Sequence, residues 1–69
     1  MTRQEWTVRA VVNGETVGWS YGDVKDAKRA WSHMSRKRET IDTGDPIETA
    51  SVRLPNGHLF YLGESVRWR

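Results

Sequence analysis

The stretch that decides the fold is WTVRAVVNGETVGWSY, residues 6–21. Its central pair, Asn13-Gly14, is the preferred two-residue turn of a β-hairpin, because both turn positions need a positive φ. Apolar and polar side chains alternate on both sides of the turn, as in a strand that buries one face. A two-residue turn also fixes the register and places Trp6 opposite Tyr21. Turn chemistry and periodicity therefore predict the same hairpin.

This hairpin is predicted to bury only one of its faces, because successive side chains of a strand point to opposite sides. The apolar face is expected to hold Trp6, Val8, Ala10, Val12, Val17, Trp19 and Tyr21. The other face is expected to hold Thr7, Arg9, Val11, Thr16, Gly18 and Ser20 and to meet solvent.

A helix is predicted from about Val24 to about Arg38. Gly22 ends the preceding strand, and Asp23 suits the N-cap because its carboxylate accepts from the first free amides. Basic residues at the far end suit the negative end of the helix dipole. Apolar residues recur at helical spacing and form one stripe. This stripe consists of Val24, Ala27, Ala30, Trp31 and Met34.

A second hairpin is predicted around Pro55-Asn56-Gly57, and two registers are open. A bare Asn56-Gly57 pair makes a two-residue loop, whereas including Pro55 makes a three-residue loop with Gly57 in the left-handed position. We favour the second, because Pro prefers the first central position of a type I turn. That register places Val52 opposite Phe60. The core face then holds Ala50, Val52, Leu54, Phe60 and Leu62.

These elements predict an α+β fold of ββαββ order. Two hairpins form a four-stranded antiparallel sheet, and one helix packs on one of its faces. We expect the 69 residues to form one domain, 1–69. One helix covers one side of such a sheet, which leaves the other face and two edge strands open. Beyond a break near Gly63-Glu64, Val66 and Trp68 are expected either to extend the last strand or to cap the core.

The amino-acid composition excludes several classes of protein. The chain has no cysteine, which excludes disulfide bonds and zinc sites built on thiolates. No apolar run approaches the roughly 20 residues of a membrane span, and residues 1–5 do not resemble a targeting signal. We therefore expect a cytoplasmic protein with no membrane partner.

Catalytic motifs are missing from the sequence. His33 and His58 have no serine or carboxylate at a spacing typical of a triad or a metal pair. The segment 42–45, Asp-Thr-Gly-Asp, is too short for a calcium loop and lacks its ligand pattern. We predict a protein that is not an enzyme and that has no cofactor and no metal.

Charge is distributed unevenly along the chain. Residues 25–38 contain six basic residues against one acid, whereas residues 39–48 contain four acids and no basic residue. At 100° per residue, Lys25, Arg29 and Arg36 form one line opposite the apolar stripe. Such a row of cations matches a nucleic-acid backbone, and the alternative is an ordinary solvated helix face. The acidic segment is either a polar linker or a surface for a partner's cationic groove.

The open sheet face is the second candidate surface. Arg9, Arg53 and Tyr61 share it, and an aromatic ring among arginines suits either stacked bases or a protein contact. The alternative is a half-wetted antiparallel sheet with no partner. Residues 67–69, Arg-Trp-Arg, add a further basic and aromatic patch.

We therefore predict a small non-catalytic binding protein that binds nucleic acid through a basic helix face. The alternative is a protein–protein interaction module, such as a small regulator or inhibitor or a homodimer, that uses the open sheet face or an edge strand. The predicted nucleic-acid-binding residues are Lys25, Lys28, Arg29 and Arg36. The predicted sheet-face residues are Arg9, Arg53 and Tyr61.

Overall fold

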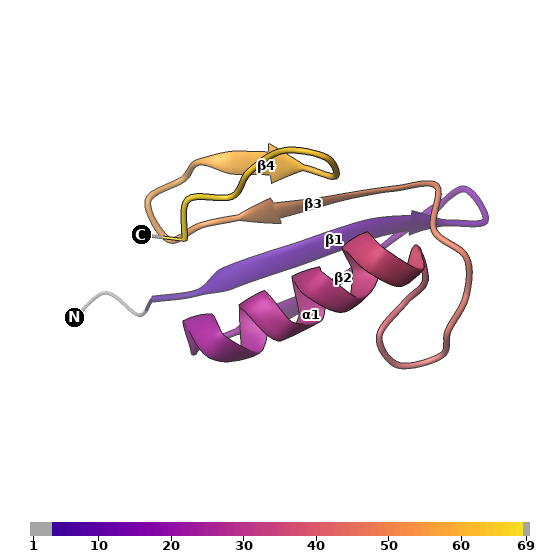
Figure 1. Cartoon of the computed structure of the whole chain (residues 1–69), viewed down its shortest axis with the longest axis horizontal. Coiled ribbons are helices and arrows are strands. Elements are labelled where there is room, and N and C mark those ends of the chain that lie inside the picture. Colours follow the sequence, from indigo (N-terminus) through magenta and orange to yellow (C-terminus); the bar gives the residue numbers. More distant parts are fainter. Residues whose placement is uncertain (1–3, 69) are drawn as a thin grey trace.

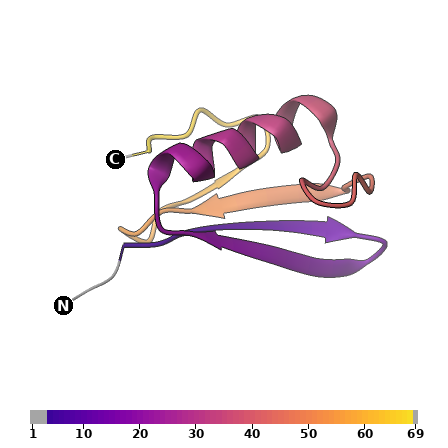
Figure 2. The ribbon, with the colours of Figure 1, turned by 90° about the horizontal axis from the view of Figure 1, so that it is seen from below.

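The computed structural model describes residues 4–68, so Arg69 of the C-terminal patch lies outside the described residues. The order of elements is β1 (Trp6–Val12), β2 (Glu15–Tyr21), α1 (Val24–Lys37), β3 (Thr49–Arg53) and β4 (Leu59–Tyr61). The strands form one antiparallel sheet in the order β2-β1-β3-β4. Helix α1 lies on one face of the sheet, and β1 and β3 are its central strands (Figure 1, Figure 2). The predicted ββαββ fold is confirmed.

The first hairpin has the predicted turn and register. Asn13 and Gly14 have φ values of 51° and 80°, as a turn with two left-handed residues requires. Trp6 pairs with Tyr21, and every residue between them pairs as the two-residue turn dictates. The carboxylate of Glu48 accepts a hydrogen bond from the amide of Gly14 at 3.3 Å, which ties the turn to the segment before β3.

Helix α1 begins and ends as its sequence indicates. The side chain of Asp23 accepts a hydrogen bond from the amide of Lys25 at 2.8 Å. At the other end, Arg38 adopts a left-handed conformation with φ of 56°, and its N–H donates to the carbonyl of Met34. This geometry satisfies one of the carbonyls that a helix end leaves free.

The second hairpin has the three-residue loop. Gly57 has a φ of 92°, and the amide of Leu54 donates to the carbonyl of His58 at 2.9 Å. Val52 pairs with Phe60. No strand follows β4 within the described residues; Val66 and Trp68 are half-buried and pack against the core, so they cap it.

The core lies between the sheet and α1. Its buried apolar side chains are Trp6, Val8, Ala10, Ala27, Ala30, Trp31, Met34, Ile47, Ala50, Val52 and Leu54. The helix stripe is buried as predicted, except that Val24 is half-buried. No helix in residues 4–68 is long and apolar enough to cross a bilayer.

The connection from α1 to β3 is more ordered than its polar sequence indicates. Thr40 is only 3% exposed, and its hydroxyl accepts a hydrogen bond from the amide of Asp45 at 3.0 Å. The hydroxyl of Thr43 lies 2.7 Å from that of Thr40 and donates to the Asp45 carboxylate. Ile47 then enters the core. The acidic loop, residues 40–45, is therefore built around a buried threonine.

Candidate nucleic-acid interface

The predicted basic line runs along the outer side of α1. Its four predicted phosphate-binding cations are all exposed, namely Lys25, Lys28, Arg29 and Arg36. The eleven steps from Lys25 to Arg36 rise by roughly 16 Å at 1.5 Å per residue. That length covers about five steps of a nucleic-acid strand, at roughly 3.4 Å per phosphate along the axis. The line is therefore long enough to meet several consecutive phosphates.

These cations are not neutralised by neighbouring acids. Within residues 4–68, the one contact at ion-pair distance joins His33 Nε2 to Glu39 Oε1, 3.6 Å apart. Asp26 lies in the first turn of the helix but makes no ion pair with Arg29. Their charges are thus available to a phosphate without breaking an internal ion pair.

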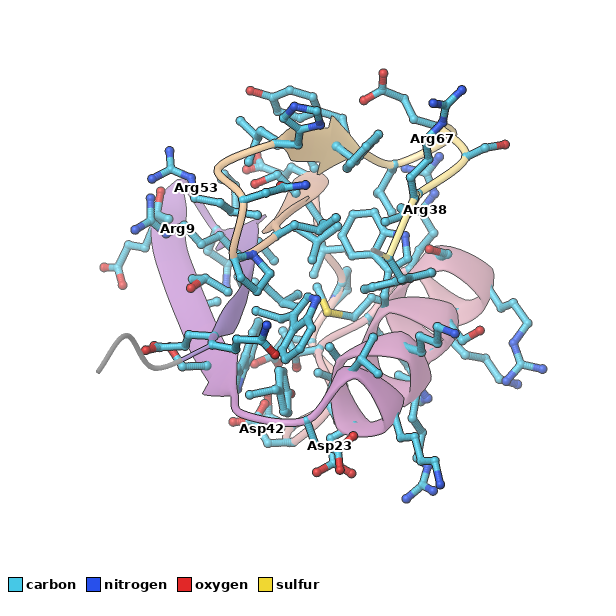
Figure 3. The ribbon with its side chains drawn as sticks, turned by 90° about the vertical axis from the view of Figure 1, so that its left-hand side faces the viewer. Arg9, Asp23, Arg38, Asp42, Arg53 and Arg67 are labelled. Carbon is cyan, nitrogen blue, oxygen red and sulfur yellow. The ribbon has the colours of Figure 1, made fainter. Side chains whose placement is uncertain are left out.

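The sheet-face residues lie on the opposite side of the molecule. Figure 3 shows Arg9 and Arg53 together on the side of the sheet that faces away from α1. Ser51 pairs with Arg9 on one side and with Tyr61 on the other, so the cation and the ring flank a small side chain. Both arginines are exposed, and Tyr61 is 52% exposed. A shallow hollow of about 200 Å³ lies between Arg9 and Tyr61.

Helix and sheet surfaces cannot contact the same stretch of backbone. The sheet and the core lie between them, and the molecule is 18 Å thick along its shortest axis. The predicted helix cations thus lie on one side of the molecule, and the predicted sheet-face residues lie together on the other. The structure does not combine them into one surface. A nucleic acid bound to the helix leaves the open sheet face uncovered.

Trp6 lies beside a hollow that the sequence pattern does not predict. Its side chain is 8% exposed, and its indole N–H is buried without an acceptor among the described residues. Beside it lies a hollow of about 430 Å³ that Lys28 and Trp68 also line. Of the four cations of the basic line, Lys28 borders this hollow and the other three do not.

The two histidines have different surroundings. His33 is half-buried beside Glu39, and His58 is exposed with its ring edge toward Phe60, at a centroid distance of 6.5 Å. In residues 4–68, no group of three or more potential ligands is placed to hold a metal ion. The absence of enzyme activity stays a prediction.

Negative charge gathers on a different side, around the end of β2. Tyr21 is half-buried at this end, and its pKa is raised above 10.0, first by burial and then by the carboxylates of Asp26 and Asp42. Asp42 belongs to the acidic loop, so the fold brings a loop acid and a helix acid to one tyrosine. Asp42 and Asp45 thus form a structured acidic surface beside the β2 edge.

Comparison with protein-family models, with curated proteins and with solved structures gave no significant match to this chain.

Proposed function

We propose that this protein binds nucleic acid through the basic line of α1. The observation that supports the proposal is a row of four exposed cations that make no ion pair with the described residues. Lysine and arginine side chains in such a row contact the phosphate backbone and not the bases. Binding is therefore expected to weaken as salt increases and to occur with many nucleic-acid sequences.

The salt dependence of binding tests the proposal quantitatively. Each phosphate neutralised on duplex DNA contributes about −0.9 to the slope of log affinity against log salt. Replacing Lys25, Arg29 and Arg36 with Gln is expected to reduce the slope by ~2–3 and to weaken binding to every sequence alike. The helix is retained, because Gln has nearly the same helix propensity as Lys and Arg. Fluorescence anisotropy with generic duplex DNA and RNA at several salt concentrations gives the slope.

Arginines outside α1 provide a matched control. A triple variant with Gln at Arg9, Arg53 and Arg67 removes the same number of positive charges from exposed positions that are not on the helix. If the slope depends only on net charge, the two triple variants behave alike and the helix is not the site. If the unmodified protein binds neither nucleic acid at physiological salt, the basic line is a solvated face.

A second candidate function is a protein contact through the open sheet face. Leu59 and Tyr61 are 40% and 52% exposed, and both project from β4 on this face beside Arg53. Tyr and Arg are enriched at the energetic centres of protein interfaces. On this hypothesis, nucleic-acid affinity is negligible, and Tyr61→Ala or Arg53→Ala abolishes partner binding while the helix variant does not.

A further inference from the structure

The two edges of the sheet differ in how their free backbone groups are satisfied. Strand β4 has three residues, and the amide of Leu62 donates back to the carbonyl of Ala50 in β3. The backbone of Tyr61 therefore points away from β3. Its amide donates to Glu64 Oε1 at 2.6 Å, and its carbonyl accepts from the Glu64 amide at 3.1 Å. The chain itself thus occupies part of this edge.

The β2 edge is longer, and nothing in the described part of the chain pairs with it. Val12 and Glu15 flank the two-residue turn and form a hydrogen-bonded pair, and such pairs alternate along an antiparallel ladder. Thr16, Gly18 and Ser20 therefore direct their N–H and C=O groups outward. None of these three amides donates to another described residue. The seven-residue strand also lacks lysine and proline, which usually protect an edge from pairing.

Two apolar hollows lie along this edge, on the side that faces the helix. The helix-side hollow measures about 350 Å³ and is lined by Tyr21, Asp26, Arg29, Ala30, His33 and Ile41. The loop-side hollow measures about 320 Å³, and its lining includes Val17, Trp19, Asp42 and Asp45.

A strand added to β2 fits these hollows. Its alternate side chains would lie on the helix side at a spacing of about 6.8 Å, next to Val17, Trp19 and Tyr21. These three residues are half-buried, and they line the two hollows. Apolar side chains at alternate positions of the added strand therefore reach both hollows. Main-chain hydrogen bonds with such pockets are a recurrent way to bind an extended peptide.

The charge beside the edge indicates which added strand is favoured. Asp42 and Asp45 border the loop-side hollow and Asp26 borders the helix-side hollow, where Arg29 supplies the opposing charge. Figure 3 shows Asp23 and Asp42 on the same side of the molecule, and Figure 1 shows the acidic loop below β1 on that side. The excess of carboxylates favours a cationic strand.

A second copy of this chain fits the edge poorly. Strand β2 contains no basic residue, and its charged residue is Glu15. Pairing two β2 strands would bring more carboxylates to an edge that already has an excess of them, and like charges at an interface are unfavourable. The complementary occupant therefore comes from another protein.

We propose that the β2 edge, which is unpaired within residues 4–68, binds an extended segment of another protein. The alternate positions of this segment that face the helix side carry apolar side chains flanked by lysine or arginine. The segment adds a fifth strand to the sheet, bonds to the backbone of Thr16, Gly18 and Ser20, and places its cations near Asp42 and Asp45. This inference does not rest on nucleic-acid binding by the helix.

A synthetic peptide tests the proposal directly. The probe is Lys-Thr-Val-Thr-Trp-Thr-Lys with both ends blocked, added to the full-length ¹⁵N-labelled protein. Its lysine, valine and tryptophan side chains share one face of the strand, because side chains alternate along it. Amide shifts measured by NMR are expected to saturate along β2, and hydrogen exchange at Thr16, Gly18 and Ser20 is expected to slow by about tenfold or more, as for amides that gain a hydrogen bond. A peptide N-methylated at alternate residues loses its donors and is expected not to bind.

Variants of the protein separate the charge effect from the fold. Asp42→Asn keeps the side-chain oxygen that accepts from the Thr43 amide, so the loop is retained while one charge is lost. We expect it to weaken peptide binding by roughly threefold or more, as for one screened charge contact. Glu64→Gln removes one carboxylate at the other edge and serves as the matched control, with affinity unchanged. The Gln variant of the basic helix line is expected to bind the peptide at least as well as the unmodified protein.

Four outcomes overturn the inference. Peptide binding is absent at millimolar concentration, or the N-methylated peptide binds as well as the parent. The exchange changes fall on β4 or α1 instead of β2, or light scattering shows a dimer whose Thr16, Gly18 and Ser20 amides are protected without peptide. The last result would make a second copy the occupant of the edge.

Discussion

Replacement of Trp31 with alanine tests the packing of the helix on the sheet. Trp31 lies at the centre of the apolar stripe of α1 and is only 7% exposed. A buried tryptophan removes ~150–250 Å² from water. At about 25 cal/mol per Å², its loss costs roughly 4 kcal/mol, within the ~3–5 kcal/mol typical of aromatic-to-alanine changes in cores.

That loss matches the whole stability expected of so small a domain, which is ~3–5 kcal/mol. The Trp31→Ala variant is therefore expected to be largely unfolded at 25 °C without denaturant. Far-UV circular dichroism and urea titration measure this directly. Ser32→Ala is the matched control, because Ser32 is exposed on the same helix and should shift stability by less than about 0.5 kcal/mol. A Trp31→Ala variant that unfolds at the same urea concentration as the unmodified protein would refute the packing described for α1.

Two further changes probe local features of the fold. Asp23→Ala removes the cap of α1 and is expected to lower the free energy of unfolding by ~1 kcal/mol in urea titration, whereas Asp23→Asn keeps the acceptor and most of that stability. Tyr21 has its pKa raised above 10.0 in the folded state, so its contribution is complete below about pH 10 and is lost as pH rises through the folded value. Stability followed upward from pH 9 should therefore decline less steeply in Tyr21→Phe, and equal declines would show that Tyr21 does not cause the loss.

Local signals in the sequence were sufficient for both hairpins. Asn13-Gly14 and Pro55-Asn56-Gly57 specify their turns through backbone conformations that few other residues adopt easily, and a short loop fixes the register of the strands that it joins. The helix was predicted for a similar reason, since a cap, an apolar stripe and its flanking charges all lie within one continuous stretch.

No local sequence pattern predicts which strands of the two hairpins pair with each other. Strand β1 pairs with β3, and Ala10 lies opposite Ala50, forty positions away in the chain. Such pairing depends on the burial of both hairpins against one helix. For the same reason, the sequence alone indicated a polar linker after α1, although Thr40 and Ile47 are buried in the structure. The segment contains two isolated isoleucines, of which Ile41 is exposed and Ile47 is buried, and two isolated residues show no periodicity.

The candidate sites also depend partly on local sequence and partly on tertiary structure. The sequence by itself determined the basic line of α1 and the grouping of Arg9, Arg53 and Tyr61 on one sheet face, because helical and strand periodicity fix which side chains share a face. Only the tertiary structure decided that β2 is an edge with no strand beside it in residues 4–68, that Glu64 covers part of β4, and that Asp42 approaches Tyr21. Those relations join segments that are distant in the chain, and the packing of the whole molecule sets them.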